Sequence, residues 1–197
     1  MQNFSEKKSV EEPLIQYFDK LGWSIRRLTP NINLKDEELG RETSTEVVLS
    51  KYLEPKLREL NPTLPEEALR NALNQLTRDR SALSLVNANH QVYDLLKDGV
   101  PVDYKDADGV QTSDKVKILD WNSPENNHFL IVSQLTILGE MYKRRPDLIG
   151  FINGIPLLLI ELKSPLESVK KAYEDNLSDY KKTIPKLFWY TGFQLVS

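Results

Sequence analysis

Apolar residues recur at helical intervals through the first hundred positions of the chain. Between residues 10 and 21 they fall three or four positions apart, and Gly22 ends the pattern. A second helix is predicted over residues 43–60, opening with a capping-box pair formed by Thr43 and Glu46. The same spacing recurs in two later segments, residues 65–78 and 87–99. The first half of the chain is therefore predicted to be mostly helical.

The pattern changes near residue 100 to short runs in which apolar and polar residues alternate. Residues 100–121 predict strands around a turn at Asp108–Gly109, and residues 128–138 predict another strand. Further strands are expected over residues 148–161 and 187–197. Between these last two lies a predicted amphipathic helix with one apolar stripe, made of Val169, Tyr173, Leu177 and Tyr180. We expect an α/β domain whose mixed central sheet begins near residue 100 and is flanked by helices.

The stretch "PDLIGFINGIPLLLIELKSP", residues 146–165, contains an apolar run that predicts a buried strand, with Glu161 and Lys163 set into its end. Because side chains alternate along a strand, Glu161 and Lys163 project from one face and Leu162 from the other. A buried charge is costly unless it is paired or binds a metal. The pair could be a simple ion pair at a strand end, or it could be part of a chemical site.

A second acid, Asp147, begins the strand that a turn at Asn153–Gly154 folds back beside Glu161. With a two-residue loop, Asp147 would oppose residue 160 and face away from Glu161. With a three-residue loop and a bulge at Gly154, Asp147 would oppose residue 159 and share a face with Glu161. Only the second register brings the two carboxylates together.

Two carboxylates beside a lysine form a hard, oxygen-rich site of the kind that Mg2+ prefers. Asp147 and Glu161 would hold the ion, which would activate a water and neutralise charge on a phosphate. Lys163 would orient that water or stabilise the developing negative charge. The pattern thus indicates hydrolysis of phosphodiesters.

The composition of the chain limits the number of domains and the kinds of site that it can contain. The 197 residues fit one domain, and the absence of cysteine excludes disulfides, zinc knuckles and thiol nucleophiles. No segment approaches the ~18 consecutive apolar residues of a membrane span, and the start of the chain has no apolar signal region, so we expect a cytoplasmic protein with no membrane partner.

Charge is unevenly distributed along the chain. Residues 1–140 carry 17 basic and 23 acidic residues, whereas residues 141–197 carry 9 and 6, a net charge of +3. Such an imbalance is often only a solvated helix face, but it could also attract a polyanion. We expect non-specific DNA binding by the lysines beyond the charged strand, namely Lys170, Lys171, Lys181, Lys182 and Lys186.

The stretch "RPDLIGFINGIPLLLIELKSP" resembles the PD-(D/E)xK nuclease motif as it occurs in the restriction subunit of type I restriction-modification enzymes. Four other segments resemble that subunit's N-terminal nuclease domain, so the resemblance covers essentially the whole chain: "NPTLPEEAL", "NHQVYDLLKDGVPVDY", "DWNSPENNHFLIVSQLTI" and "IPKLFWYTGFQLVS". It implies a restriction-endonuclease-like fold, with residues 1–197 as one endonuclease domain. Residues 1–99 would be mostly helical and residues 100–197 would form the sheet-rich catalytic core.

The resemblance also implies site residues. It makes Asp147, Glu161 and Lys163 catalytic and places Leu162 with the two acids at the Mg2+ site. An N-terminal glutamate ahead of a Gly-aromatic pair corresponds here to Glu11, which could equally be an ordinary exposed acid of a helix. The family's Q-x-x-x-Y helix would supply Tyr180, with Asn176 in place of the glutamine, a shorter side chain on the same helix face.

The type I subunit that the chain resembles continues into an ATP-driven DNA translocase. No G-x-x-x-x-G-K-[ST] phosphate loop occurs in this chain, so ATP would be used only by a motor region outside it. The implied partners are double-stranded DNA and the methyltransferase and specificity subunits of a type I restriction-modification complex. Two alternatives remain open: a catalytically silent docking or allosteric module of that complex, and a free-standing repair or junction nuclease of the same fold.

Overall fold

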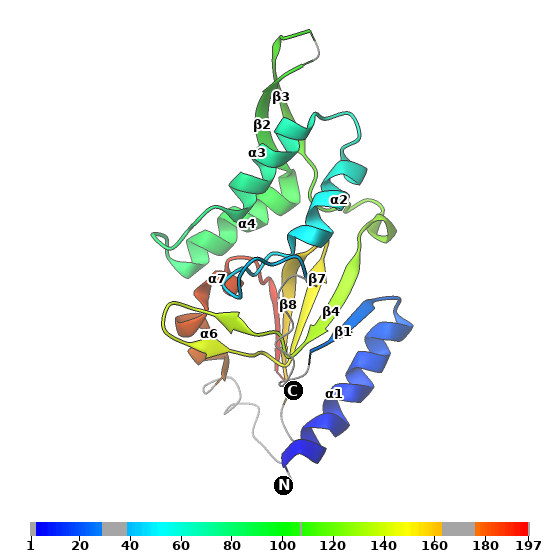
Figure 1. Cartoon of the computed structure of the whole chain (residues 1–197), viewed down its shortest axis with the longest axis vertical. Helices are drawn as coiled ribbons and strands as arrows, with labels where there is room; N and C mark the ends of the chain where they lie inside the picture. The colour runs from blue at the N-terminus through cyan, green and yellow to red at the C-terminus, as the bar shows by residue number, and fades with distance from the viewer. Residues whose placement is uncertain (1–2, 29–38, 107, 163–175, 197) are drawn as a thin grey trace.

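A computed structural model describes residues 3–28, 39–106, 108–162 and 176–196 of the chain. A central sheet lies in the lower half of Figure 1, and a group of helices and a projecting hairpin lie above it. Among the described residues, the helices are too short or too polar to cross a lipid bilayer.

The central sheet is mixed and has the strand order β1-β4-β7-β8-β9. Its strands are β1 (Ser24–Arg27), β4 (Phe129–Ser133), β7 (Leu148–Ile152), β8 (Ile155–Glu161) and β9 (Phe193–Val196). The outer strands β1 and β9 run parallel to their neighbours β4 and β8, while the inner pairs are antiparallel. The α/β fold with a mixed central sheet flanked by helices is confirmed.

Helix α1 (Asn3–Lys20) packs on one face of this sheet. Its residues Ile15 and Phe18 are buried against Ile131 of β4, Leu148 of β7 and Ile160 of β8. These apolar positions are three apart on the helix, so they lie on one side of it and turn the charged residues towards solvent. Gly22, with φ of +83°, ends the segment in the left-handed conformation that favours glycine.

The opposite face of the sheet belongs to a larger apolar core shared with the remaining helices. These are α2 (Ser50–Leu60), α3 (Glu66–Thr77), α4 (Leu85–Asp98), α6 (Ser178–Thr183) and α7 (Pro185–Phe188). Buried residues of α3 follow the helical repeat predicted from sequence, at Ala68, Leu69, Ala72 and Leu76. Residues of both halves of the chain thus contribute to one core.

Three smaller elements extend from this body. Strands β2 (Val100–Lys105) and β3 (Gln111–Val116) form a separate antiparallel hairpin that projects beyond α3 (Figure 1). Strands β5 (Ile137–Leu138) and β6 (Lys143–Arg144) form a second, shorter hairpin. The 3-10 turn η2 (Pro124–Asn126) precedes β4.

Three expectations from the sequence are wrong. The strand predicted over residues 187–197 begins only at Phe193, because Leu187 and Phe188 belong to helix α7. The helix predicted over residues 43–60 begins only at Ser50, because Thr43 and Glu46 form a turn instead: the main-chain N–H of Glu46 donates to the carbonyl oxygen of Thr43 at 3.2 Å. The central sheet does not begin near residue 100, since the hairpin found there is separate and β1 supplies an edge strand from the helical half. Most of the predicted helix containing Val169 and Tyr173 lies outside the described residues, which resume at Asn176.

Candidate active site

The β7–β8 hairpin turns through a two-residue loop. Ile152 pairs with Ile155, and both loop residues have positive φ, +51° at Asn153 and +81° at Gly154. These angles match the turn that an Asn-Gly pair favours in a twisted hairpin. The three-residue loop that would have brought the acids together is therefore wrong.

A bulge farther along the hairpin shifts the pairing by one residue, and this shift brings the two acids opposite each other. Phe151 pairs with Pro156 and Gly150 pairs with Leu158, which leaves Leu157 as an extra residue on β8. Proline has no N–H to give to a ladder, and a bulge is one of the few places where an inner strand accepts it. After the bulge Leu148 pairs with Ile160, so the next step in the register sets Asp147 opposite Glu161.

Asp147 is fully buried and held by three hydrogen bonds from the residues that directly follow strands β4 and β8. The main-chain N–H of Leu162 donates to its Oδ2 at 2.9 Å, and the side-chain amide of Gln134 donates to its Oδ1 at 3.1 Å. The main-chain N–H of Gln134 also donates to the carbonyl oxygen of Asp147 at 2.8 Å. The carboxylate is thus fixed in position from both sides.

Glu161 is 2% exposed and receives donors from the segment around α6. The side-chain amide of Asn176 donates to Oε1, and the hydroxyl of Tyr180 donates to Oε2 at 3.4 Å. Burial, followed by the negative charges of Glu161 and Asp147, raises the pKa of the Tyr180 hydroxyl well above its usual range. Tyr180 therefore stays a neutral hydrogen-bond donor. Because the charges of both carboxylates affect its hydroxyl, Asp147 and Glu161 both lie near it.

Glu11 of α1 reaches this cluster through Gln134. The side-chain amide of Gln134 donates to Oε2 of Glu11 at 3.2 Å as well as to Asp147. Glu11 could be part of the site or an ordinary exposed acid of the helix. The hydrogen bond that it shares through Gln134 with Asp147 favours the first interpretation. Its role there stays a prediction.

Gln134 was not found from the sequence. It follows β4 with φ of +59°, a conformation that is uncommon for residues other than glycine. Such strained positions concentrate at functional sites. The available signal was the polar pair Ser133–Gln134, which ends the apolar run "FLIV" of residues 129–132.

The oxygen atoms present suit a hard divalent cation. Within the described ranges no group of three or more acidic or histidine side chains could hold a metal. Mg2+ needs only one or two carboxylates, because water and substrate oxygens complete its shell. Asp147 and Glu161 meet that requirement, and Leu162 could add only its main-chain carbonyl oxygen.

The predicted basic residues fall into two groups. Lys163, Lys170 and Lys171 lie outside the described residues. Lys181 and Lys182 occupy the last turn of α6, directly after Tyr180. Lys186, on α7, lines a different cavity, so these lysines do not form one continuous stripe beside the acids.

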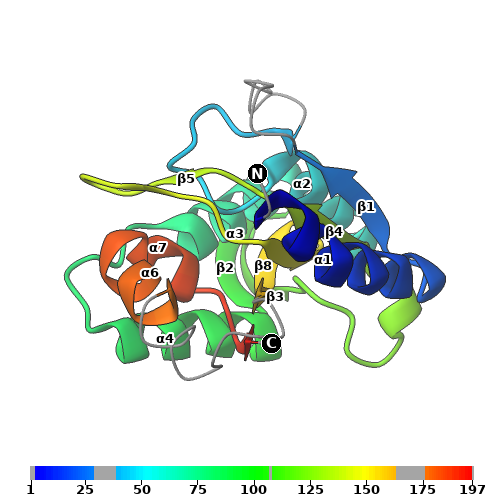
Figure 2. The same ribbon diagram turned by 90° about the horizontal axis from the view of Figure 1, so that it is seen from below.

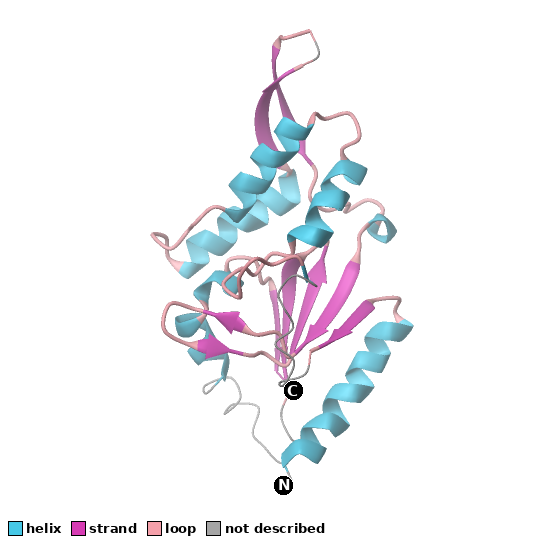
Figure 3. Ribbon diagram, viewed as in Figure 1, coloured by secondary structure: helices cyan, strands magenta, loops and turns pink. Residues whose placement is uncertain are grey.

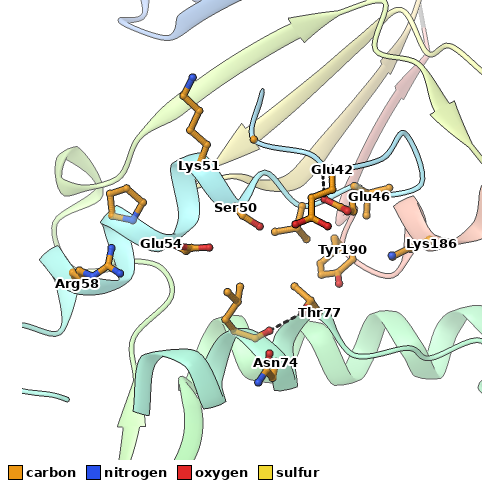
Figure 4. Close-up of a pocket in the computed structure, with 15 residues that line it drawn as sticks. Glu42, Glu46, Ser50, Lys51, Glu54, Arg58, Asn74, Thr77, Lys186 and Tyr190 are labelled. Carbon is orange, nitrogen blue, oxygen red and sulfur yellow. Dashed lines mark hydrogen bonds between the residues drawn. The ribbon is translucent and has the colours of Figure 1, made fainter. Parts of the chain in front are cut away.

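That cavity, of about 920 Å³, lies between α2, α3 and α7 (Figure 4). Carboxylates of Glu42, Glu46 and Glu54 line it together with Lys51 and Arg58 among others. The guanidinium of Arg58 is paired with Glu66 at 2.6 Å. Neither Asp147 nor Glu161 borders this cavity, so it is distinct from the buried acid pair.

Known proteins resemble this chain over nearly its whole length. The profile of the family described as "Type I restriction enzyme R protein N terminus" matches residues 3–197. The HindI endonuclease subunit of a type I restriction enzyme from Haemophilus influenzae is 33% identical over 194 residues, which cover 97% of this chain and 18% of that protein.

A second relative comes from Methanocaldococcus jannaschii. It is provisionally named as the MjaIXP endonuclease subunit of a type I restriction enzyme and is 30% identical over 204 residues, covering 98% of this chain. The chain spans 18% of the length of each of these two relatives. The match of the family profile to nearly every residue, together with these identities, shows that the chain belongs to the family of type I restriction enzyme R protein N termini.

Proposed function

We propose that the chain hydrolyses phosphodiester bonds of double-stranded DNA with Mg2+ bound at Asp147 and Glu161. The observation that carries the proposal is the pairing of two buried carboxylates across β7 and β8, surrounded by side-chain donors. Two buried like charges repel each other, and a bound cation would offset that cost. The names of the relatives, all endonuclease subunits, support the same chemistry.

In this proposal each residue of the site has its own role in catalysis. Asp147 and Glu161 hold the ion, with the carbonyl oxygen of Leu162 as a third available ligand. Once bound, Mg2+ would lower the pKa of a coordinated water and neutralise charge on the scissile phosphate. Gln134 and Tyr180 orient the two carboxylates, which keeps their oxygens directed at one point. Lys163, predicted from the sequence, would stabilise the developing negative charge.

We further propose that cleavage has no sequence preference within this chain and serves a larger restriction complex. The chain spans only 18% of its relatives' length, which leaves room in them for the ATP-driven motor. Recognition of the DNA site would then belong to the methyltransferase and specificity subunits.

The test uses supercoiled plasmid and the purified chain, with Mg2+ titration followed by calorimetry. The parent is expected to bind Mg2+ and to convert the plasmid to nicked and linear forms. Asp147→Asn should lose both properties, while Glu125→Gln, an exposed acid on η2, should keep both. A parent that neither binds Mg2+ nor nicks DNA would instead support the silent docking module.

Lys163→Ala separates binding from chemistry. An ammonium group cannot ligate a metal, so this variant should keep or slightly increase Mg2+ affinity while losing cleavage. Calorimetry and the plasmid assay on the same preparation measure both quantities. Equal loss of Mg2+ binding and cleavage would contradict the role given to the lysine.

A further inference from the structure

A groove of about 300 Å³ lies between the β5–β6 hairpin, the α6–α7 segment and residues 81–85, and Lys181 and Lys182 in its lining directly follow Tyr180 of the acid site. Figures 1 and 2 both show the hairpin running alongside α6 and α7. Its lining is apolar at Leu83, Met141 and Trp189 and basic at Lys181 and Lys182. Apolar surface interleaved with lysine is typical of surfaces that bind nucleic acid.

The hairpin tip displays large side chains to solvent. Met141 is 82% exposed and Tyr142 is 50% exposed, although both border the groove. The guanidinium of Arg144 lies 5.0 Å from the centre of the Tyr142 ring and covers one side of it. An exposed tyrosine that already carries a cation on one face can stack a nucleobase on the other.

An ion pair connects this hairpin to the active site. Nε of Arg144 lies 2.5 Å from Oδ2 of Asp179, and Nη2 donates to Oδ1 at 3.2 Å. Tyr180, the next residue, donates to Glu161, while Asp147 follows Arg144 by three positions in the chain. The groove and the acid pair therefore share α6: Lys181 and Lys182 line the groove, and Tyr180 contacts Glu161.

The charge around the groove favours an anion. The hairpin carries Lys143, Arg144 and Arg145 against Glu140, and α6 adds Lys181 and Lys182. The acid on α6, Asp179, is paired with Arg144, whose hydrogen bond and then positive charge lower the pKa of the Asp179 carboxyl. Lys143 and Lys182 are both exposed, and Lys182 lines the groove, so their charges are available to phosphates.

We propose that this groove binds an unpaired strand of DNA next to the active site, with a base stacked on Tyr142 and the backbone phosphates near Lys143 and Lys182. The volume suits one nucleotide, and a base can stack on the Tyr142 ring only when it is unpaired. This inference rests on the proposed nuclease function and adds to it a substrate class, DNA with locally separated strands.

Binding is measured with a fluorescent oligodeoxythymidine of about 12 nucleotides and a blunt duplex of the same length, by anisotropy in EDTA. Because metal is absent, a failure of the Mg2+ proposal does not change this measurement. Tyr142→Ala should weaken binding of the single strand at least about fivefold, the lower end for loss of one stacked base. Tyr142→Phe should retain the parent affinity, because the ring remains.

Salt dependence tests the phosphate contact separately. Lys182→Ala should reduce the slope of log affinity against log salt concentration by about 0.7, while Tyr142→Ala leaves the slope unchanged. Tyr93→Ala is the matched control, because Tyr93 on α4 is 53% exposed and lies outside the groove lining. Single-strand affinity that is unchanged in the groove variants, or reduced no more than duplex affinity, would overturn the inference.

Discussion

Replacing Glu161 by glutamine tests whether its charge exists for the fold or for a cation. The change keeps the shape of the side chain and its hydrogen bonds. The amide oxygen can still accept from Asn176, and the amide nitrogen can donate to the Tyr180 hydroxyl, which rotates to accept. The variant therefore removes one negative charge of a facing pair while keeping these two hydrogen bonds.

The expected change in the free energy of unfolding follows from the pairing of Asp147 opposite Glu161. Opposed residues of an antiparallel pair have Cβ atoms about 5 Å apart. At ~5 Å and an effective dielectric constant of ~20, two like charges repel by about 3 kcal/mol. Donors around Asp147 and Glu161 offset part of this repulsion, so we expect Glu161→Gln to stabilise the metal-free chain by about 2 kcal/mol, or ~6 °C in Tm for a domain of this size.

The assay is thermal unfolding with and without Mg2+, compared with Glu125→Gln as the exposed control. Saturating Mg2+ at ~100 times its Kd should stabilise the parent by about 2.7 kcal/mol and leave Glu161→Gln unchanged. If the carboxylate of Glu161 serves only as a buried ion-pair partner, the substitution should instead destabilise the chain by about 3–5 kcal/mol. A fall in Tm of that size without Mg2+ stabilisation of the parent would refute the reasoning.

Three other predictions concern stability. Gly154→Ala should cost about 3 kcal/mol or more in urea unfolding, because a Cβ there would lie 2.4 Å from the carbonyl oxygen of Leu49 and φ is +81°. Burial, then the charges of Lys56 and Arg26, lowers the pKa of His128, so stability should fall as pH drops below ~6.5, by at most ~1.4 kcal/mol per pH unit; His128→Phe should remove that slope. Burial raises the pKa of Tyr190 to about 12, so about 3 kcal/mol of stability should disappear between pH 10 and pH 12 in the parent but not in Tyr190→Phe.

Helices α1, α3 and α4 could be predicted from sequence because the apolar residues of each lie on one side of the helix and pack against one core. The start of α2 could not, since Thr43 and Glu46 have the composition of a capping box and form a turn. Strand β1 was missed because "SIRR" is short, lies at the sheet edge and carries two exposed arginines. Edge strands need little apolar alternation, so sequence periodicity identifies them poorly.

At the candidate site, the two acids were predictable and their surroundings were only partly so. Asp147 and Glu161 stand out as charges next to apolar runs. The polar pair Ser133–Gln134 marks the end of such a run but does not indicate the positive φ of Gln134. The register could not be derived either. Pairing from the turn alone misses the bulge at Leu157, whose position depends on how Pro156 is accommodated in the sheet.

The bulge has a consequence for recognising this site in other sequences. Leu157 opposes no residue of β7, so a chain without it would pair regularly from Ile152–Ile155 onward and still set Asp147 opposite Glu161. The number of residues separating the two acids can therefore vary by one while their pairing stays the same. A search that fixes this spacing would miss relatives with the same arrangement, whereas one that allows a single insertion between the turn and the glutamate would retain them.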